Sequence, residues 1–204
     1  MNRSIHMTLC FILLPLCNVL GQTVKGNHEL HVQVGDGLPP AIVHEISYAL
    51  SDAFGSAFSG YEIEKVGNQL PGIFGAGYRY YVSARFSVGA DVDYMKTTYD
   101  YTLTKGTEVR QGEREMQVLS GLITLQWVYL NKSKIQVYGE LGGGISHFSG
   151  YSRVLSADKN TYNDTMIGVQ LNPIGLRFGN RFGGYLSLGI GTRSIGTLGF
   201  SVRL

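Results

Sequence analysis

The sequence has little cysteine, and it has no long apolar run after its first twenty residues. Its two cysteines, Cys10 and Cys17, lie in a segment that we expect to be removed during export. The remaining chain then offers no disulfide framework and no cysteine metal site. No later segment holds the roughly 18 consecutive apolar residues of a membrane-spanning helix. A membrane protein made from this chain would therefore have to be a closed barrel.

The N-terminus has the order of a secretory signal peptide. Arg3 precedes an apolar run at 9–20, and Val19 and Gly21 supply the small residues that precede a cleavage site. The run is too short to span a membrane, and leucine precedes each cysteine, which does not fit the lipoprotein pattern. We predict a cleaved signal peptide at 1–21 and one domain at 22–204.

Charge is nearly balanced over the chain. There are 17 Lys and Arg against 15 Asp and Glu, and the expected cleavage removes only Arg3. No strongly basic face is indicated, so we expect no nucleic-acid partner.

Eight segments alternate between apolar residues and small or polar residues, which is the pattern of a β-strand. In the segment 85–95, Phe86, Val88 and Val92 share one face, and Asp91 and Asp93 lie on the other. The other seven segments are 29–34, 73–82, 119–129, 135–148, 162–178, 182–190 and 197–204. We therefore predict an all-β fold.

In the segment 162–178 the apolar positions change parity across Pro173. Val169 belongs to an odd-numbered set, whereas Ile174 belongs to an even-numbered one. A proline inside a strand marks an edge or a bulge, and one extra residue reverses the faces of a strand. We predict a β-bulge at this point.

Strand length, face composition and connection length favour a membrane barrel over a soluble sheet. Several strands reach the ~10 residues of a tilted crossing, and the polar face suits a narrow filled lumen. Short turns are expected at 83–84, 131–133 and 179–181, and longer connections at 36–69, 102–112 and 150–161. Short periplasmic turns and longer extracellular loops are typical of outer-membrane barrels. The last outer loop, near Arg193, is short and breaks this trend.

The polar face carries charges of both signs. They belong to Glu29, His31, Arg79, Arg85, Asp91, Asp93, Glu140, Arg177 and Arg203. A buried charge without a partner costs several kcal/mol, and an eight-stranded barrel is just wide enough for side chains to fill it. We predict that these residues form an ion-pair network that closes the lumen.

The first long connection contains a helical pattern at 39–58, and Pro40 suits a helix start. Four residues share the apolar face of this helix: Ile42, Ile46, Leu50 and Ala53. We predict a short helix in the first extracellular loop. It could cap the barrel mouth, lie along the membrane interface, bind a partner, or only pack on the rim.

No catalytic or metal-binding motif is present. The histidines form no H-E-x-x-H pair, Gly142 to Gly144 lack the Lys-Ser/Thr of a phosphate loop, and the sequence contains no G-x-S-x-G. Asp91 and Asp93 could be a carboxylate pair, but no histidine accompanies them in sequence. We expect no cofactor and no metal.

With these features the chain resembles the small outer-membrane β-barrel family, which is related to the OmpA-type transmembrane domain. The most specific match is the last strand, where Gly199, Val202 and Leu204 fit the spacing of the terminal assembly signal, although an aromatic residue usually stands in place of Leu204. The resemblance implies an eight-stranded antiparallel up-and-down transmembrane barrel without a peptidoglycan-binding domain. It also implies two partners in a Gram-negative cell, the outer-membrane lipid and the barrel-assembly machinery.

These features favour a non-enzymatic barrel that acts through its extracellular loops as a structural or surface-interaction protein. Two alternatives stay open: a narrow porin-like barrel that passes small molecules, and an outer-membrane enzyme that modifies lipid or peptide. The sequence does not identify a surface ligand.

Overall fold

The computed structural model describes residues 25–42, 62–66, 72–105, 107–154 and 159–204. The expected signal peptide lies outside these residues. The strands are β1 (His28–Gly35), β2 (Glu62–Val66), β3 (Ile73–Tyr81), β4 (Phe86–Lys105), β5 (Glu108–Asn131), β6 (Ile135–Val154), β7 (Asn160–Gly179), β8 (Phe182–Gly191) and β9 (Gly196–Arg203).

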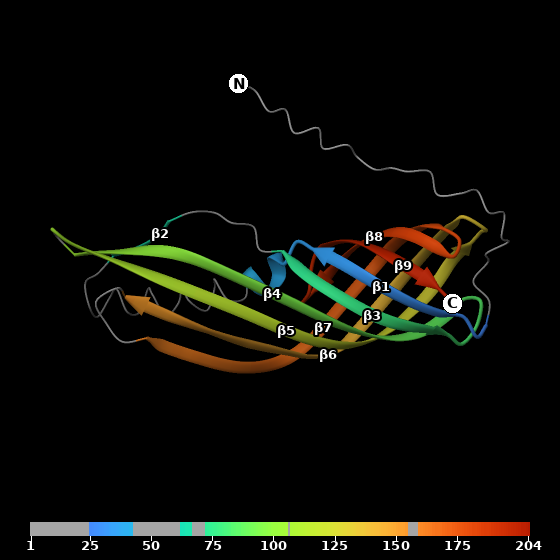
Figure 1. Ribbon diagram of the computed structural model, residues 1–204, viewed down its shortest axis with the longest axis horizontal. Coiled ribbons are helices and arrows are strands. Elements are labelled where there is room, and N and C mark those ends of the chain that lie inside the picture. Colours follow the sequence, from blue (N-terminus) through green and yellow to red (C-terminus); the bar gives the residue numbers. More distant parts are fainter. Residues whose placement is uncertain (1–24, 43–61, 67–71, 106, 155–158) are drawn as a thin grey trace, which may run out of the picture.

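Eight of these strands form a closed antiparallel ring (Figure 1). The order around the ring is β1-β3-β4-β5-β6-β7-β8-β9, and β9 pairs back with β1. The additional strand, β2, pairs only with residues 100–104 of β4. The prediction of an all-β, eight-stranded antiparallel barrel is confirmed.

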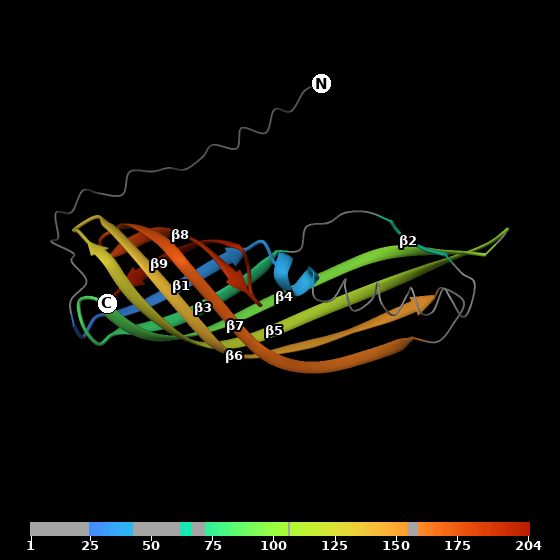
Figure 2. The same cartoon turned by 180° about the vertical axis from the view of Figure 1, so that it is seen from behind.

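The strands of the ring have two very different lengths. β1, β3, β8 and β9 have 8 to 10 residues, whereas β4, β5, β6 and β7 have 20 to 24. The four long strands continue beyond the ring as a projecting sheet, which makes the molecule elongated (Figures 1 and 2). The expected loop at 102–112 is therefore wrong, because β4 and β5 stay paired as far as Lys105 and Glu108.

The start of the predicted helix is present as a single turn at 38–42. The carboxylate of Asp36 accepts a hydrogen bond from the Leu38 N–H (3.0 Å), and the Ala41 N–H donates to the Gly37 carbonyl. Ile42 lies in this turn and is half exposed; Ile46, Leu50 and Ala53 lie outside the described residues. No helix of the described residues is long and apolar enough to span a membrane.

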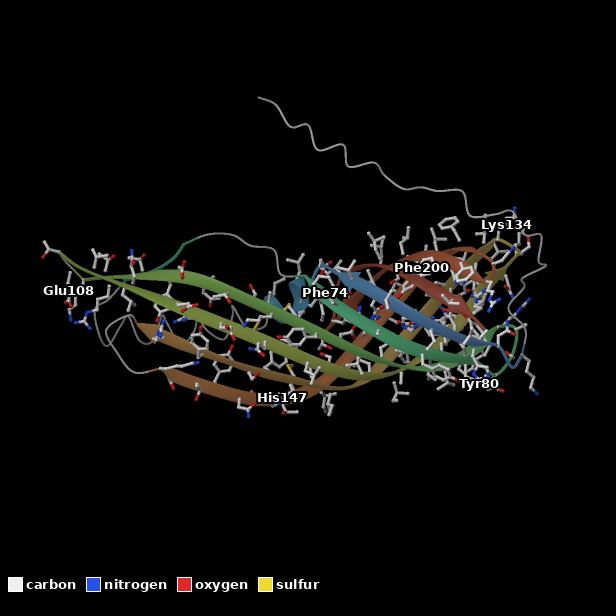
Figure 3. The ribbon with its side chains drawn as sticks, in the orientation of Figure 1. Phe74, Tyr80, Glu108, Lys134, His147 and Phe200 are labelled. Atoms are coloured by element: carbon white, nitrogen blue, oxygen red, sulfur yellow. The ribbon has the colours of Figure 1, made fainter. Side chains whose placement is uncertain are left out.

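The barrel wall is apolar outside and polar inside, the reverse of a soluble protein. On β1, the outward side chains of Leu30 and Val32 are 50% and 56% exposed, whereas the inward side chain of Glu29 is 1% exposed. The same alternation runs around the ring, with Ile123 exposed and Gln126 buried on β5. Figure 3 shows Phe74 and Phe200 on the outer surface of the barrel.

The β-bulge predicted at Pro173 is present in β7. Between Tyr138 and Glu140 of β6, β7 advances from Gly175 to Asn172 and thus contains one extra residue. β8 shows the same shift. The inward positions of β7 change accordingly from Asn172 to Arg177, so an apolar outer face is kept on both sides of the bulge.

Candidate functional site

The polar side chains in the lumen form two layers. The lower layer, on the side of the short turns, is built around the carboxylate of Glu29. Its oxygens lie 3.0 Å from Arg79 Nη1, 2.6 Å from Arg203 Nε and 3.5 Å from Arg177 Nε. Arg203 also contacts the amide oxygen of Gln136. β1, β3, β7 and β9 are thereby joined through side chains as well as through their backbone ladders.

Arg177 also closes the turn below this layer. Its guanidinium donates to the carbonyls of Gly179 (2.9 Å) and Asn180 (3.0 Å), and its Nε donates to Ser201 Oγ (2.7 Å). The side chain therefore holds the turn between β7 and β8 through its backbone carbonyls.

The upper layer is built around Arg193, which comes from the loop between β8 and β9. Its guanidinium lies 2.7 Å from Asp91 Oδ2, 3.5 Å from Asp93 Oδ2 and 3.2 Å from Glu140 Oε1. Arg79 contacts both Glu140 and the carboxylate of the lower layer, so the two layers form one network.

Two further side chains contact the carboxylates of this layer. His31 Nε2 lies 3.0 Å from Asp91 Oδ1, and Gln33 donates to Asp93 Oδ1 (2.7 Å). An added Cβ at Gly77 would lie 2.2 Å from Asp91 Oδ1, which shows how completely side chains fill this part of the barrel.

The structure brings together eight of the nine residues predicted for the lumen. Arg85 is the exception: it is exposed in the turn between β3 and β4. The sequence pattern assigned it to the start of a strand, but the strand begins one residue later, at Phe86. Whether the network closes the lumen to ions is a functional prediction.

Arg193 was not predicted as a lumen residue. It is 2% exposed although it lies in a loop, because this loop folds into the barrel. The carboxylate of Asp36 holds the outer part of this loop by accepting from the N–H groups of Ile195 (3.2 Å) and Gly196 (2.7 Å). The unusually short outer loop was the one sequence signal that could have indicated this position.

An apolar cluster covers the upper layer. It contains Ile73, Met95, Met116, Val118 and Phe148, all less than 10% exposed, with Ala41 of the helical turn packed against it. Met95 follows Asp93 by two residues on the inward face of β4, so the lumen changes from charged to apolar towards the projecting sheet.

The outer face of the projecting sheet carries ion pairs between neighbouring strands. Lys96 Nζ lies 3.0 Å from Glu115 Oε2, and Arg153 Nη2 lies 3.5 Å from Glu113 Oε2. The hydrogen bond from Gln117 (2.6 Å) and the ion pair with Lys96 hold the pKa of Glu115 below its ordinary value. Cations and carboxylates are thus matched on this surface.

Two of the predicted assembly residues, Gly199 and Val202, lie on opposite faces of β9, and Leu204 directly follows the strand. Gly199 faces inward, where an added Cβ would lie 2.3 Å from Cζ of the Tyr185 ring. Val202 and Leu204 point outward, and Leu204 is 62% exposed. Packing against Tyr185 therefore favours glycine at position 199 independently of any assembly signal. Recognition of these residues by the assembly machinery stays a prediction.

Among the described residues, no group of three or more His, Cys, Asp or Glu side chains is arranged to hold a metal ion. The carboxylates of the upper layer instead face a guanidinium, His31 and amide donors.

No protein-family profile matches the sequence, and no curated protein is significantly similar to it. The fold is similar to that of Ail, the attachment invasion locus protein of Yersinia pestis, in two crystal structures. One of these contains the heparin analogue sucrose octasulfate. In both, the identity is 14%, the TM-score is 0.50, and the match covers 89% of this chain and 100% of Ail. The chain therefore has the fold of the small outer-membrane β-barrel proteins.

Proposed function

We propose that the protein is an integral β-barrel of the outer membrane of a Gram-negative cell. The observation that carries this proposal is the outward belt of exposed apolar side chains around a charged interior. Such a belt would be costly in water but is stable in hydrocarbon, where a closed barrel also leaves no unpaired strand edge. Export through cleavage after Gly21 and insertion by the barrel-assembly machinery belong to the same proposal.

Cell fractionation and gel mobility test this placement. We expect the protein in the outer-membrane fraction and a change of mobility after boiling, because a folded barrel resists detergent until it is heated. Recovery in a soluble fraction, with the same mobility before and after boiling, would contradict the proposal.

We further propose that the lumen does not conduct. Arg79, Arg177, Arg193 and Arg203 face four carboxylates inside a ring that is just wide enough for side chains. Planar-bilayer recordings are expected to show no stable large openings. Such openings would favour the alternative of a narrow porin-like barrel.

We propose that the protein is not an enzyme and that its projecting sheet is an interaction surface. β4 to β7 continue past the apolar belt for a length that the barrel itself does not need. The carboxylates of the upper layer are buried and face Arg193, His31 and Gln33, so they do not form an exposed pair that a substrate could reach. Turnover of lipid or peptide by the folded protein would contradict this.

The surface partner we propose is not a polyanion, although Ail was crystallised with sucrose octasulfate. The described part of the projecting sheet, in β4 to β7 and at Lys159, contains six Lys or Arg and five Asp or Glu. Three pairs of opposite charge are in direct contact: Lys96 with Glu115, Arg110 with Glu108, and Arg153 with Glu113. Intact cells that display the protein are expected to bind no more labelled heparin at physiological salt than cells that lack it.

A further inference from the structure

At the end of the barrel that carries the short turns, the exposed charged side chains of the described residues are of one sign. Five cations lie there, all exposed, and we call them the basic rim: Lys25, Arg85, Lys132, Lys134 and Arg181. In the described segments of this end (25–28, 82–85, 132–134 and 179–181), no Asp or Glu is present. Glu29, the first carboxylate side chain beyond the segment 25–28, is buried in the lumen and bonded to arginines.

The projecting sheet at the other end provides a direct comparison. Its cations are nearly equalled in number by carboxylates, and three of them make ion pairs. The net positive charge of the described barrel is therefore concentrated at the short-turn end. A surface of this kind attracts anions.

The positions of the rim cations relative to the apolar belt indicate which anion they meet. Arg85 is followed by Phe86 (38% exposed), Lys134 by Ile135 (42%), and Arg181 by Phe182 (47%). The guanidinium of Arg181 lies 5.9 Å from the centroid of the Phe182 ring. Each of these cations thus stands directly beside the last outward apolar side chain of its strand; Figure 3 shows Lys134 and Tyr80 at this end of the barrel.

We infer that the basic rim binds the phosphate groups of anionic phospholipids in the leaflet at the short-turn end. This inference rests on the proposed membrane placement and names the lipid headgroup class for one leaflet. If the belt marks the hydrocarbon, cations at its border lie at the depth of the headgroups. A cell-wall polymer would require charges that extend away from the membrane beyond the turns. Lys and Arg beside an anionic lipid surface are attracted individually and additively.

The single tryptophan of the chain reports on this site. Trp127 pairs across the sheet with Phe86, and the Val128 N–H donates to the Arg85 carbonyl (2.8 Å). The protein is folded into phosphatidylcholine vesicles that contain a minor fraction of phosphatidylglycerol. The acyl chains of one lipid or the other are brominated close to the headgroup, and quenching of Trp127 is measured.

At equal mole fraction of brominated lipid, we expect about twofold more quenching by phosphatidylglycerol than by phosphatidylcholine. The excess is expected to disappear at high salt, because ions screen the attraction. It is also expected to disappear in a rim variant that combines Arg85→Gln, Lys132→Gln, Lys134→Gln and Arg181→Gln.

A control variant loses the same charge from the projecting sheet through Lys96→Gln, Lys105→Gln, Arg110→Gln and Lys159→Gln. This variant should keep the excess quenching by phosphatidylglycerol.

Equal quenching by the two lipids in the unmodified protein would overturn the inference, and so would an excess that survives in the rim variant. If the rim variant does not fold, the salt dependence of the unmodified protein decides. Equal quenching together with rim-dependent binding to purified peptidoglycan would assign the rim to the wall instead. If the gel mobility of the protein changes on heating but the quenching shows no lipid preference, only this inference is refuted. If the gel mobility does not change on heating, the proposed function is refuted.

Discussion

The hydroxyl of Tyr129 donates a hydrogen bond to the carbonyl oxygen of Pro173, 3.1 Å away and two strands further round the barrel. Gly139 of the intervening strand permits this, since an added Cβ there would lie 2.4 Å from the Tyr129 oxygen. Pro173 lies in the bulge of β7, where the ladder is interrupted. The tyrosine thus supplies a donor to a backbone carbonyl on the apolar surface.

Tyr129→Phe removes this donor while it keeps the ring. We expect the free energy of unfolding in vesicles to fall by about 1–2 kcal/mol, because an unpaired carbonyl next to hydrocarbon is costly. Denaturant titration measures the change. Tyr94→Phe is the matched control, since Tyr94 is also outward and half exposed; an equal loss in both variants would contradict the role of the bond.

Arg193→Ala leaves Asp91, Asp93 and Glu140 without their shared cation. We expect a loss of about 3–5 kcal/mol in the free energy of unfolding, as for other buried charges that lose their partner. Asp91→Asn in the same chain should recover part of this loss. Arg110→Ala, at an exposed pair, should change stability by less than about 1 kcal/mol. Similar small effects at both arginines would show that the upper layer is not held by ion pairing.

Gly199→Ala places a methyl group against the Tyr185 ring. We expect a lower folded fraction, on the order of 1–3 kcal/mol of overpacking, and recovery when Tyr185→Ala makes room. The heat-dependent gel shift after refolding into vesicles, without any assembly machinery, measures both. If the double variant folds no better than Gly199→Ala, the glycine is required for a reason other than packing.

The pKa of Glu115 should lie below its ordinary value of about 4.3 in an NMR titration. Because its pKa is lowered in the folded state, the stabilisation from its ionised form is present above the ordinary pKa. That stabilisation is lost as the pH falls through the folded value. Gln117→Ala removes the largest cause and should raise the pKa of Glu115. Gln111→Ala, on the same strand, should leave it unchanged.

The faces of the strands were predictable because alternation is a property of neighbouring residues. Glu29 and Leu30 lie on opposite sides of β1 whatever the rest of the chain does. The bulge at Pro173 was predictable for the same reason, since one extra residue must exchange the two faces.

The extent of β4 to β7 was not predictable in this way. Residues 96–105 and 108–118 contain polar side chains on both faces, which in isolation resembles a loop. They form strands because each continues a hairpin whose register is already set by the barrel. The observed strand ends therefore differ most from the predicted ones where the sequence is polar. Arg85 was assigned to the lumen because the predicted strand began one residue too early.

Residue order alone was enough to establish an all-β chain with an apolar and a charged face, because a period of two needs no distant partner. Only the closed ring decided which charges meet: Arg193 reaches Asp91, 102 residues earlier, because the β8–β9 loop folds into the barrel. That choice depends on the free-energy cost of leaving the buried carboxylates of Asp91 and Asp93 without the Arg193 guanidinium. The cost arises only once the strands have enclosed them.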